Sequence, residues 1–434
     1  MFYLLKRDTM EKAVNNKVLK ATGVSFWQLR AFFTMGILYL CYYFCKYNLG
    51  AAIPEMQKEF GFTSQTVGWI ITMFTLTYAG GQFINGFLGD RYGPKLIMIV
   101  GAIGGVVANV CFGLSATLTF FVVFWVVNAY FSSCGWAPGS RITYNWFPEN
   151  RWGEWMGIYN ALCYSGAFLV FPIATFSVSR WGWRSAFFVC PAFLLLMAIG
   201  FSFLGKGSPQ DAGLAPEWEQ KNHKRPAKRI GGKEYWIAFT NVKMNLAYLS
   251  GFGANFIRWG ILSWMVKILA EPVQQGGFGL SLIAAGWITS LASLGGAFFS
   301  IVLGIISDRV FNGSRWQTIL IGFILGSLPL FYVAKGPVIL DYPMGLYLMA
   351  AAIFLSGGLI QGVQTPLFNL PGDILGREMG GTGVGIMDGW MYVGAAFAGV
   401  FFGWWLDTYG LTSGVMLMAV VGVVSGLLAI LIQK

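Results

Sequence analysis

Apolar stretches of about 20 residues recur along the whole chain, and this pattern constrains the fold more than any other feature. A helix needs about 20 such residues to cross the hydrocarbon core of a bilayer. Because backbone groups in lipid must be satisfied within their own segment, each stretch is predicted to be a membrane-spanning helix. The twelve stretches lie at 29–53, 66–88, 96–114, 117–140, 153–177, 184–204, 243–270, 280–305, 316–335, 344–371, 381–404 and 410–432.

The composition supports a membrane protein and argues against nucleic-acid binding. Hydrophobic residues make up 56% of the chain and charged residues only 11%, whereas a soluble domain carries about 25% charged residues. The net charge of +11 comes from Lys and Arg in short loops between apolar stretches. No soluble basic domain is left to bind nucleic acid.

Loops rich and poor in Lys and Arg alternate along the chain, which predicts its orientation. The segment before the first span and every even-numbered loop are rich, whereas the other loops hold only Lys58, Arg180, Arg184 and Lys335. Basic loops stay in the cytoplasm, so both termini are predicted to be cytoplasmic, in the plasma (inner) membrane. The longest loop, 205–240, is either a solvated linker or a binding segment for anionic lipid headgroups.

An internal repeat divides the spans into two equivalent halves. The segment GFLGDRYGPK (86–95) follows the second span, and GIISDRVFNGSR (304–315) follows the eighth, so Asp90 and Asp308 are 308 − 90 = 218 residues apart. Parallel six-helix repeats can rock against each other around a central site. We therefore expect a cytoplasmic segment at 1–28, six-helix bundles at 29–204 and 243–434, and a linker at 205–242.

Two basic residues lie far from the ends of the predicted spans, where an ionisable side chain costs several kcal/mol and needs a reason. Lys46 is in the first span and Arg258 in the seventh, and the spacing of 258 − 46 = 212 residues makes them equivalents under the repeat. Facing cations repel unless an anion lies between them, and phosphate suits the Arg fork and the Lys point charge. The alternative is snorkelling to a membrane surface, which we favour for Lys267 near the end of the seventh span.

One acidic residue, Asp388, lies well within an apolar stretch. It has three candidate roles: a structural salt bridge with Lys46 or Arg258, a proton carrier, or a partner for a cationic group of the substrate. The two cations and Asp388 together leave a net positive site, which favours anions or zwitterions with a phosphate.

Aromatic and amide side chains inside the spans are candidates for lining the same site. Tyr43 and Tyr47 flank Lys46, and pairs spaced four residues apart share one face of a helix. Each aromatic residue has packing as its alternative role. The candidate lining residues are Tyr42, Tyr43, Tyr78, Gln82, Trp136, Asn160, Tyr164, Trp264, Gln361 and Tyr392, with Trp259 as a further one.

The sequence offers little for metal or covalent chemistry. The six cysteines are scattered with no CxxC, and His223, the only histidine, lies in a charged loop. A metal site or cofactor is therefore not expected. We find no nucleophile–base pair and no phosphate-cradling glycine loop, so an enzyme is the least favoured class.

The loop after the second span resembles the signature GxxxDRxGxK of the major facilitator superfamily. Gly86, Asp90, Arg91, Gly93 and Lys95 fill this pattern. The resemblance implies two six-helix bundles and a conformational-coupling role for Gly86, Asp90 and Arg91. The repeated positions, Asp308 and Arg309, are expected to act likewise.

Segments along most of the chain are similar to the organophosphate:phosphate antiporter family. They are YYFCKYNLGAAIP, TLTYAGGQFINGFLGDR, SSCGWAPGS, NWFPENRWGEWMGIYNA, FIRWGILSW and ISDRVFNGSR. The resemblance implies that the basic residues at positions 46 and 258 hold phosphate. The family usually has Arg at the position of Lys46. The bacterial glycerol-3-phosphate carriers have Lys in place of Gln82, His in place of Cys163 and Asp in place of Ser263, and they lack an acid that matches Asp388.

Three functions follow as hypotheses. The first is exchange of an organic phosphate ester for inorganic phosphate by alternating access, in a monomer. The second is uptake of an organic carboxylate with H⁺, in which Asp388 carries the proton. The third is a transporter-like sensor of a sugar phosphate.

Overall fold

The computed structural model describes residues 25–147, 152–214, 236, 238–341, 344–375 and 380–433. Every regular element within these residues is helical, as the apolar stretches predicted. Most of the N-terminal segment 1–28 and of the loop 205–240 lies outside the described residues, and so does the proposed lipid contact of that loop.

The first six predicted spans are present as helices in the N-terminal half. The fourth span is divided at Gly135, where the backbone passes against the ring of Tyr39 so closely that a Cβ would lie 2.1 Å from it. The helices are α2 (Phe26–Phe60), α3 (Ser64–Tyr92), α4 (Pro94–Leu114), α5 (Leu118–Ser132), α6 (Trp136–Trp146), α7 (Trp152–Trp181) and α8 (Ala186–Leu204).

The C-terminal half repeats this order, and its tenth span is divided like the fourth. The eleventh span is also divided, next to Gly399. The helices are α11 (Val242–Ala270), α12 (Leu282–Ile305), α13 (Arg315–Val333), α14 (Gly345–Gly362), α15 (Gln364–Leu375), α16 (Gly380–Phe397), α17 (Val400–Tyr409) and α18 (Leu411–Leu431).

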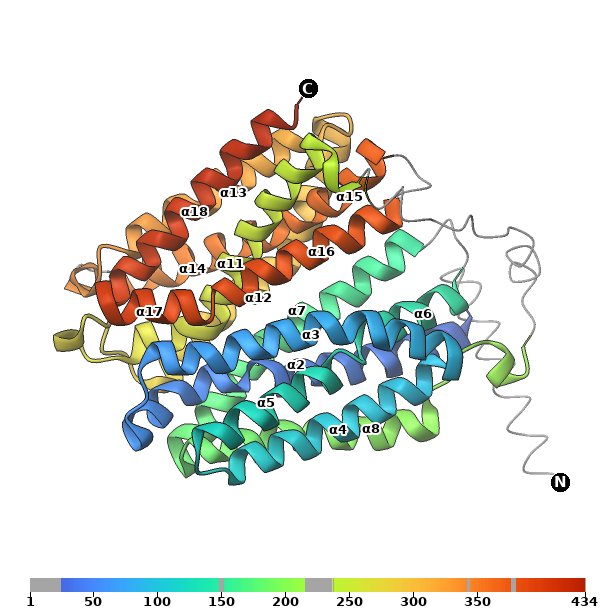
Figure 1. Ribbon diagram of the computed structural model, residues 1–434, viewed down its shortest axis with the longest axis horizontal. Helices are drawn as coiled ribbons and strands as arrows, with labels where there is room; N and C mark the ends of the chain where they lie inside the picture. Colours follow the sequence, from blue (N-terminus) through green and yellow to red (C-terminus); the bar gives the residue numbers. More distant parts are fainter. Residues whose placement is uncertain are drawn as a thin grey trace.

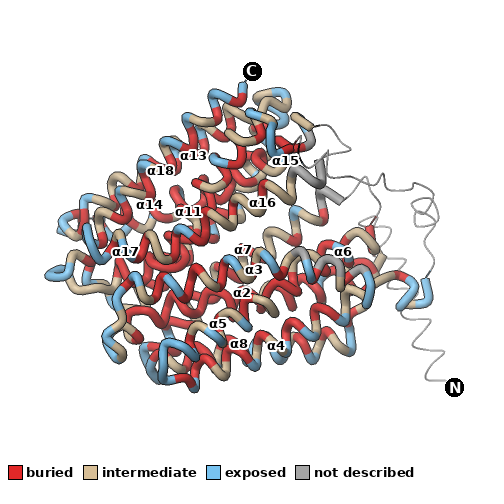
Figure 2. The backbone as a smooth tube through the Cα atoms, viewed as in Figure 1, coloured by how far each residue is buried: buried red, intermediate tan, exposed pale blue. Residues whose placement is uncertain are grey.

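The helices form two bundles that lie side by side, one from each half of the chain (Figure 1). Among the described residues, nine helical segments are long and apolar enough to cross a membrane. The other three predicted spans, α2, α3 and α11, lie centrally and carry the polar residues discussed below. Buried positions run almost continuously along α2, whereas α4 and α8 alternate between buried and exposed positions (Figure 2). The protein therefore has the fold of a multi-pass membrane protein, with apolar side chains of the outer helices facing lipid.

The two bundles are joined most closely at one end, where α2 and α11 end and α3 begins; we call this the closed end. There a Cβ on Gly68 of α3 would lie 2.6 Å from the carbonyl oxygen of Gly399, and one on Gly286 would lie 2.3 Å from Thr175 Oγ1. The bundles diverge toward the opposite end, where α2 begins and α18 ends (Figure 1). We call this the terminal end.

A chain of three asparagine side chains ties the N-terminal bundle together. Asn48 donates to Asn109 Oδ1 at 2.9 Å, Asn109 donates to Asn128 Oδ1 at 2.9 Å, and Asn128 donates to the Cys45 carbonyl at 2.8 Å. All three asparagines are fully buried. The network links α2, α4 and α5, and removing its middle member would cost Asn48 and Asn128 one hydrogen bond each, leaving Asn48 with the Ala186 carbonyl and Asn128 with the Ser132 hydroxyl.

Asn109→Leu is expected to lower the free energy of unfolding by about 1–3 kcal/mol, because the buried amides of Asn48 and Asn128 each lose a partner. Thermal unfolding of the detergent-solubilised protein measures this. Ser179→Ala is the control, because this exposed hydroxyl donates only within its own helix. An Asn109→Leu variant as stable as wild type would contradict the prediction.

Candidate functional site

Lys46 lies at the centre of the molecule, on the helix that the N-terminal bundle surrounds. Its side chain is only 7% exposed, and its ammonium group donates no hydrogen bond to any residue that the structure describes. Aromatic rings surround it instead. Its Nζ lies 3.8 Å from the ring centre of Tyr78, 5.4 Å from Trp259, 5.5 Å from Tyr43, 5.8 Å from Tyr47 and 6.0 Å from Tyr392.

This set of five rings, the aromatic cage, stabilises the ammonium group without neutralising it. A cation over an aromatic face is attracted by about 0.5–2 kcal/mol, the larger values applying away from water. A carboxylate partner would instead cancel the charge. Lys46 therefore does not snorkel, and its positive charge remains available to an anion.

Arg258 of α11 supplies the second cation, from the other half. One terminal nitrogen donates to Gln364 Oε1 at 3.4 Å, and the guanidinium lies 5.4 Å from the ring centre of Tyr164 in α7. Arg258 Nε is buried and has no hydrogen-bond partner, and the Tyr47 hydroxyl lies beside the Arg258 guanidinium. Because buried polar atoms are almost always paired, the unpaired Nε marks a place for a ligand.

Asp388 of α16 adds one negative charge to this group. Its carboxylate attracts both Lys46 and Arg258, while the two cations repel each other. Within the described residues, Asp388 makes no ion pair, so the structural salt bridge weighed from sequence does not form here. A Cβ added to Gly385 or Gly389 on the same helix would meet nothing within 4 Å. Asp388 therefore stands beside open space.

The structure brings several predicted lining residues to this group. Tyr43, Tyr78 and Tyr392 belong to the aromatic cage, and the Tyr164 ring faces Arg258. Gln82 and Asn160 lie one helical turn from Tyr78 and Tyr164, toward the terminal end, and both are half-buried. Trp136 of α6 stacks on Tyr159, with ring centres 5.2 Å apart.

Three other candidates are turned away from the site, which corrects their expected position. The Tyr42 hydroxyl donates to the carbonyl of Met98 in α4, and the Trp264 indole donates to the carbonyl of Ala398 at 2.8 Å. The Gln361 amide donates to the Ala292 carbonyl at 2.8 Å, holding α12 against α14. These side chains bind backbone within their own half.

Lys267 is likewise not where the sequence suggested. It is 8% exposed, and its ammonium donates to Ser64 Oγ at 2.6 Å across the two halves. The expected snorkelling to the membrane surface is therefore wrong.

Gln364 was missed by the sequence analysis. It is buried at the start of α15, and its amide nitrogen donates to Asn255 Oδ1 at 3.1 Å, which leaves its oxygen for Arg258. Asn255 is three residues before Arg258 on α11, so the pair orients the guanidinium. The available signal was a polar residue within the tenth apolar stretch, 344–371.

The cavity beyond Lys46 toward the closed end is narrow. It is lined by Lys46, Tyr47, Trp125, Trp259 and Ser263 among others, and measures about 10 Å³. That is room for one water molecule at most. This cavity is therefore too small to admit a phosphate ester to the two cations from the closed end in this conformation.

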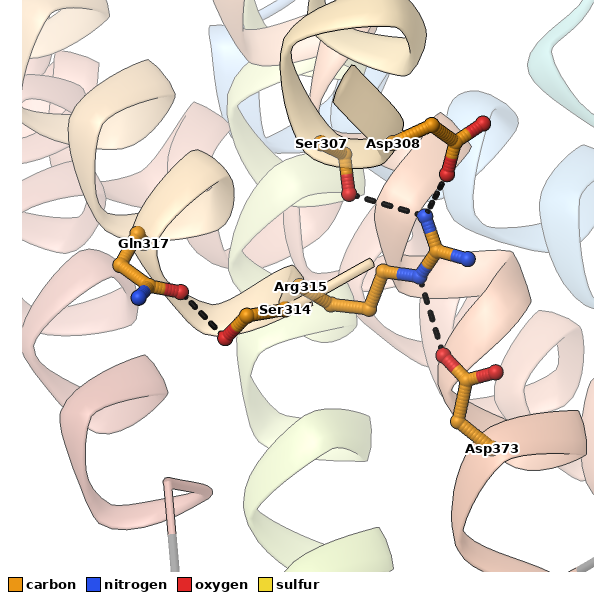
Figure 3. Close-up of polar contacts among 6 residues, drawn as sticks. All are labelled: Ser307, Asp308, Ser314, Arg315, Gln317 and Asp373. Atoms are coloured by element: carbon orange, nitrogen blue, oxygen red, sulfur yellow. Dashed lines mark hydrogen bonds and ion pairs between the residues drawn. The ribbon is translucent and has the colours of Figure 1, made fainter. Parts of the chain in front are cut away.

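The repeated loop motif of the C-terminal half forms a network within that half (Figure 3). Arg315 pairs with Asp308, donates to Ser307 Oγ at 2.9 Å, and pairs with Asp373 at the end of α15 at 2.9 Å. Asp308 therefore ties the eighth span to the ninth and tenth rather than to the other half. Arg91 and Arg309 are exposed, and the surroundings of Gly86 and of the Asp90 side chain lie outside what the structure describes.

The sequence model of the Major Facilitator Superfamily matches residues 35–387 and, in a second overlapping match, residues 246–434. The chain belongs to the major facilitator superfamily. The membership and the two-bundle fold predicted from the loop signature are thereby confirmed. A solved bacterial homologue of the human lysosomal transporter Spinster, in an inward-facing unoccupied conformation, has the same fold, with a TM-score of 0.74 at 14% identity over 94% of this chain and 97% of that chain.

The relatives of this major facilitator protein lie in the organophosphate:phosphate antiporter family, as predicted. A probable hexose phosphate transport protein of Chlamydia trachomatis is 26% identical over 89% of this chain and 87% of its own. The membrane sensor protein UhpC of Escherichia coli is 25% identical over 93% of this chain and 91% of its own. The glycerol-3-phosphate transporter of Bacillus subtilis is 25% identical over 90% of this chain and 89% of its own.

Gln364→Leu is expected to weaken the binding of inorganic phosphate by about 1 kcal/mol, or roughly fivefold in Kd, because Arg258 loses the acceptor that orients it. Isothermal titration of the purified protein measures this. Gln361→Leu is the matched control: it should lower the melting temperature and leave the Kd unchanged. If Gln361→Leu weakened binding and Gln364→Leu did not, the assignment of the two amides would be reversed.

Proposed function

We propose that the protein is a secondary transporter that binds an organic phosphate ester between Lys46 and Arg258 and exchanges it for inorganic phosphate. The observation that carries this proposal is a pair of buried cations, one from each half, whose charges no described residue neutralises through an ion pair. The named relatives that transport a hexose phosphate and glycerol 3-phosphate support the same substrate class.

A phosphate group suits this site better than a smaller anion. Arg258 Nε has no acceptor, the Tyr47 hydroxyl lies beside the same guanidinium, and no described residue accepts a hydrogen bond from Lys46 Nζ. A phosphate ester offers three peripheral oxygens, and charge-assisted hydrogen bonds to them are the strongest available. The organic part would extend toward Asp388, Gln82 and Asn160, where the site is open.

Alternating access gives this binding a transport function. We propose that the bundles 29–204 and 243–434 rock about the site, with both termini cytoplasmic and the terminal end facing the cytoplasm. Gly86, Asp90, Arg91, Asp308 and Arg309 would couple the two halves when that end closes. The transporter would act as a monomer in the plasma membrane, with anionic lipid as a partner of the linker, and have no enzymatic activity.

Lys46→Ala and Arg258→Ala are each expected to abolish exchange, because each removes one cationic partner of the bound phosphate and leaves part of its buried negative charge uncompensated, a loss of about 2–5 kcal/mol. The assay is uptake of radiolabelled glucose 6-phosphate or glycerol 3-phosphate into proteoliposomes preloaded with inorganic phosphate. Lys335→Ala is the control, because this lysine is exposed and is not one of the proposed site residues. Transport at the wild-type rate by either site variant would refute the proposed site.

A second function is favoured by the free carboxylate of Asp388. A proton carrier has to be accessible and unpaired in one state, and Asp388 makes no ion pair with a described residue and is half-buried. The protein would then carry an organic carboxylate with H⁺, the carboxylate taking the place of phosphate between the two cations.

Asp388→Asn distinguishes the two transport functions. If the protein exchanges phosphates, the variant should retain exchange at zero pH gradient, since Asn cannot carry a proton but leaves both cations. If the protein is a symporter, the variant should lose uptake driven by an inward pH gradient. Parallel assays in the same proteoliposomes measure both, and equal loss in the two assays would assign Asp388 to ligand contact or to folding instead.

A sensor is the third candidate, because one relative is a membrane sensor protein. A sensor would bind the phosphate ester without moving it. Titration and exchange on one preparation distinguish these cases: binding with no exchange under any gradient would favour the sensor.

A further inference from the structure

At the closed end, one residue of the N-terminal half is held by two opposite charges of the C-terminal half. The backbone N–H groups of Ser64 and Gln65 donate to the Asp407 carboxylate at 3.0 and 2.8 Å. The Ser64 hydroxyl accepts a hydrogen bond from Lys267 at 2.6 Å. Ser64 therefore lies between the carboxylate of Asp407 in α17 and the ammonium group of Lys267 in α11.

The chemistry of each contact suits its position. Ser64 and Gln65 begin α3, where the helix presents unpaired N–H groups and a partial positive charge that a carboxylate stabilises. Lys267 and Ser64 are both buried, so this hydrogen bond is shielded from water. Lys267 has no carboxylate within ion-pair distance among the described residues, although the negative charges of Glu271 and Asp407 both attract it.

The backbone around Ser64 is packed without space for a side chain. A Cβ on Gly403 would lie 2.3 Å from the Ser64 carbonyl oxygen, and one on Gly68 would lie 2.6 Å from the carbonyl oxygen of Gly399. Thr72 bridges the break between α16 and α17, donating to the Ala396 carbonyl at 2.7 Å and accepting from Val400 N–H at 2.9 Å. The contact between α3 and α17 is thus a closed seam.

We infer that Ser64, Lys267 and Asp407 form a two-position clasp for this seam. In the closed position Ser64 separates the two charges. When the halves part at this end, Ser64 leaves with the N-terminal half, and Lys267 pairs directly with Asp407, which stays on the same half. Opening therefore leaves no charge without a partner, and the two positions stay close in free energy, as a switching element requires.

The clasp goes beyond the proposed substrate and does not depend on which anion is carried. It assigns to Lys267 and Asp407 the control of access from the closed end. Because Lys267 changes its partner from Ser64 to Asp407, the clasp predicts a ranking of mutant effects on opening that a simple bond between the halves would not give. Removing the Ser64 hydroxyl weakens only the closed position, whereas removing Lys267 weakens both positions.

The test is the rate at which a maleimide labels a cysteine behind the seam. Ile71, which is buried and lines the narrow cavity, is replaced by cysteine after the six native cysteines are changed to serine or alanine. The measurement uses detergent-solubilised protein without substrate, so its outcome is separate from that of the transport assays. Ser64→Ala is expected to raise the labelling rate by roughly tenfold or more, the effect of losing a hydrogen bond to a charged group.

Lys267→Met should raise the labelling rate less than Ser64→Ala, and adding Ser64→Ala to it should have no further effect. Gly68→Ala should also raise the rate, because its Cβ forces the seam apart. Ser177→Ala and Gly80→Ala are the matched controls, since the Ser177 hydroxyl stays within its helix and a Cβ at Gly80 meets nothing within 4 Å. Both controls should label at the parent rate.

The clasp is refuted if Ser64→Ala leaves the labelling rate unchanged, or changes it equally with and without Lys267. An unchanged rate in Gly68→Ala would refute the seam itself as the barrier. Hydrogen exchange of the protein with its native cysteines provides a second measurement in case the cysteine replacements prevent folding. There, Ser64→Ala should speed exchange in both α3 and α17, and unchanged exchange in α17 would also overturn the proposal.

Discussion

The buried ammonium group of Lys46, held by aromatic faces and by no carboxylate of a described residue, is the interaction on which the functional site depends. Burying a charge is costly unless a partner compensates it. The aromatic cage compensates only in part, since its attraction is far weaker than an ion pair in the same surroundings. The site consequently keeps a net positive charge that a bound anion can neutralise.

The aromatic cage also explains why the two halves must share the site. Tyr43, Tyr47 and Tyr78 come from the N-terminal bundle, and Trp259 and Tyr392 from the C-terminal bundle. An anion that contacts both Lys46 and Arg258 is held by contacts whose strength depends on the position of one bundle relative to the other. A ligand shifts a conformational equilibrium only by such differences in affinity, so binding and rocking are coupled by the same pair of charges.

The closed end and the site have different chemistry, which suits their different tasks. The site leaves hydrogen-bond donors without acceptors, and a bound anion can supply those acceptors. The seam between α3 and α17 pairs its polar groups across the halves, through Thr72, Ser64 and their partners. A gate with satisfied groups is stable when shut, while a site with orphaned groups is stable only when occupied.

By itself, the sequence determined the twelve spans, the repeat, and the equivalence of Lys46 and Arg258, because length, hydropathy and spacing record them directly. Only the tertiary structure decided which way each side chain points. Gln361 and Gln364 lie three residues apart, yet one holds two helices together and the other orients Arg258; Tyr42 and Tyr43 are neighbours that face different helices. Lys267, which was expected to snorkel, instead donates a hydrogen bond to Ser64 of the other half. Central helices such as α2 and α11 are buried along most of their length, so no polar stripe marks the face that meets the ligand, and the neighbouring helices determine it.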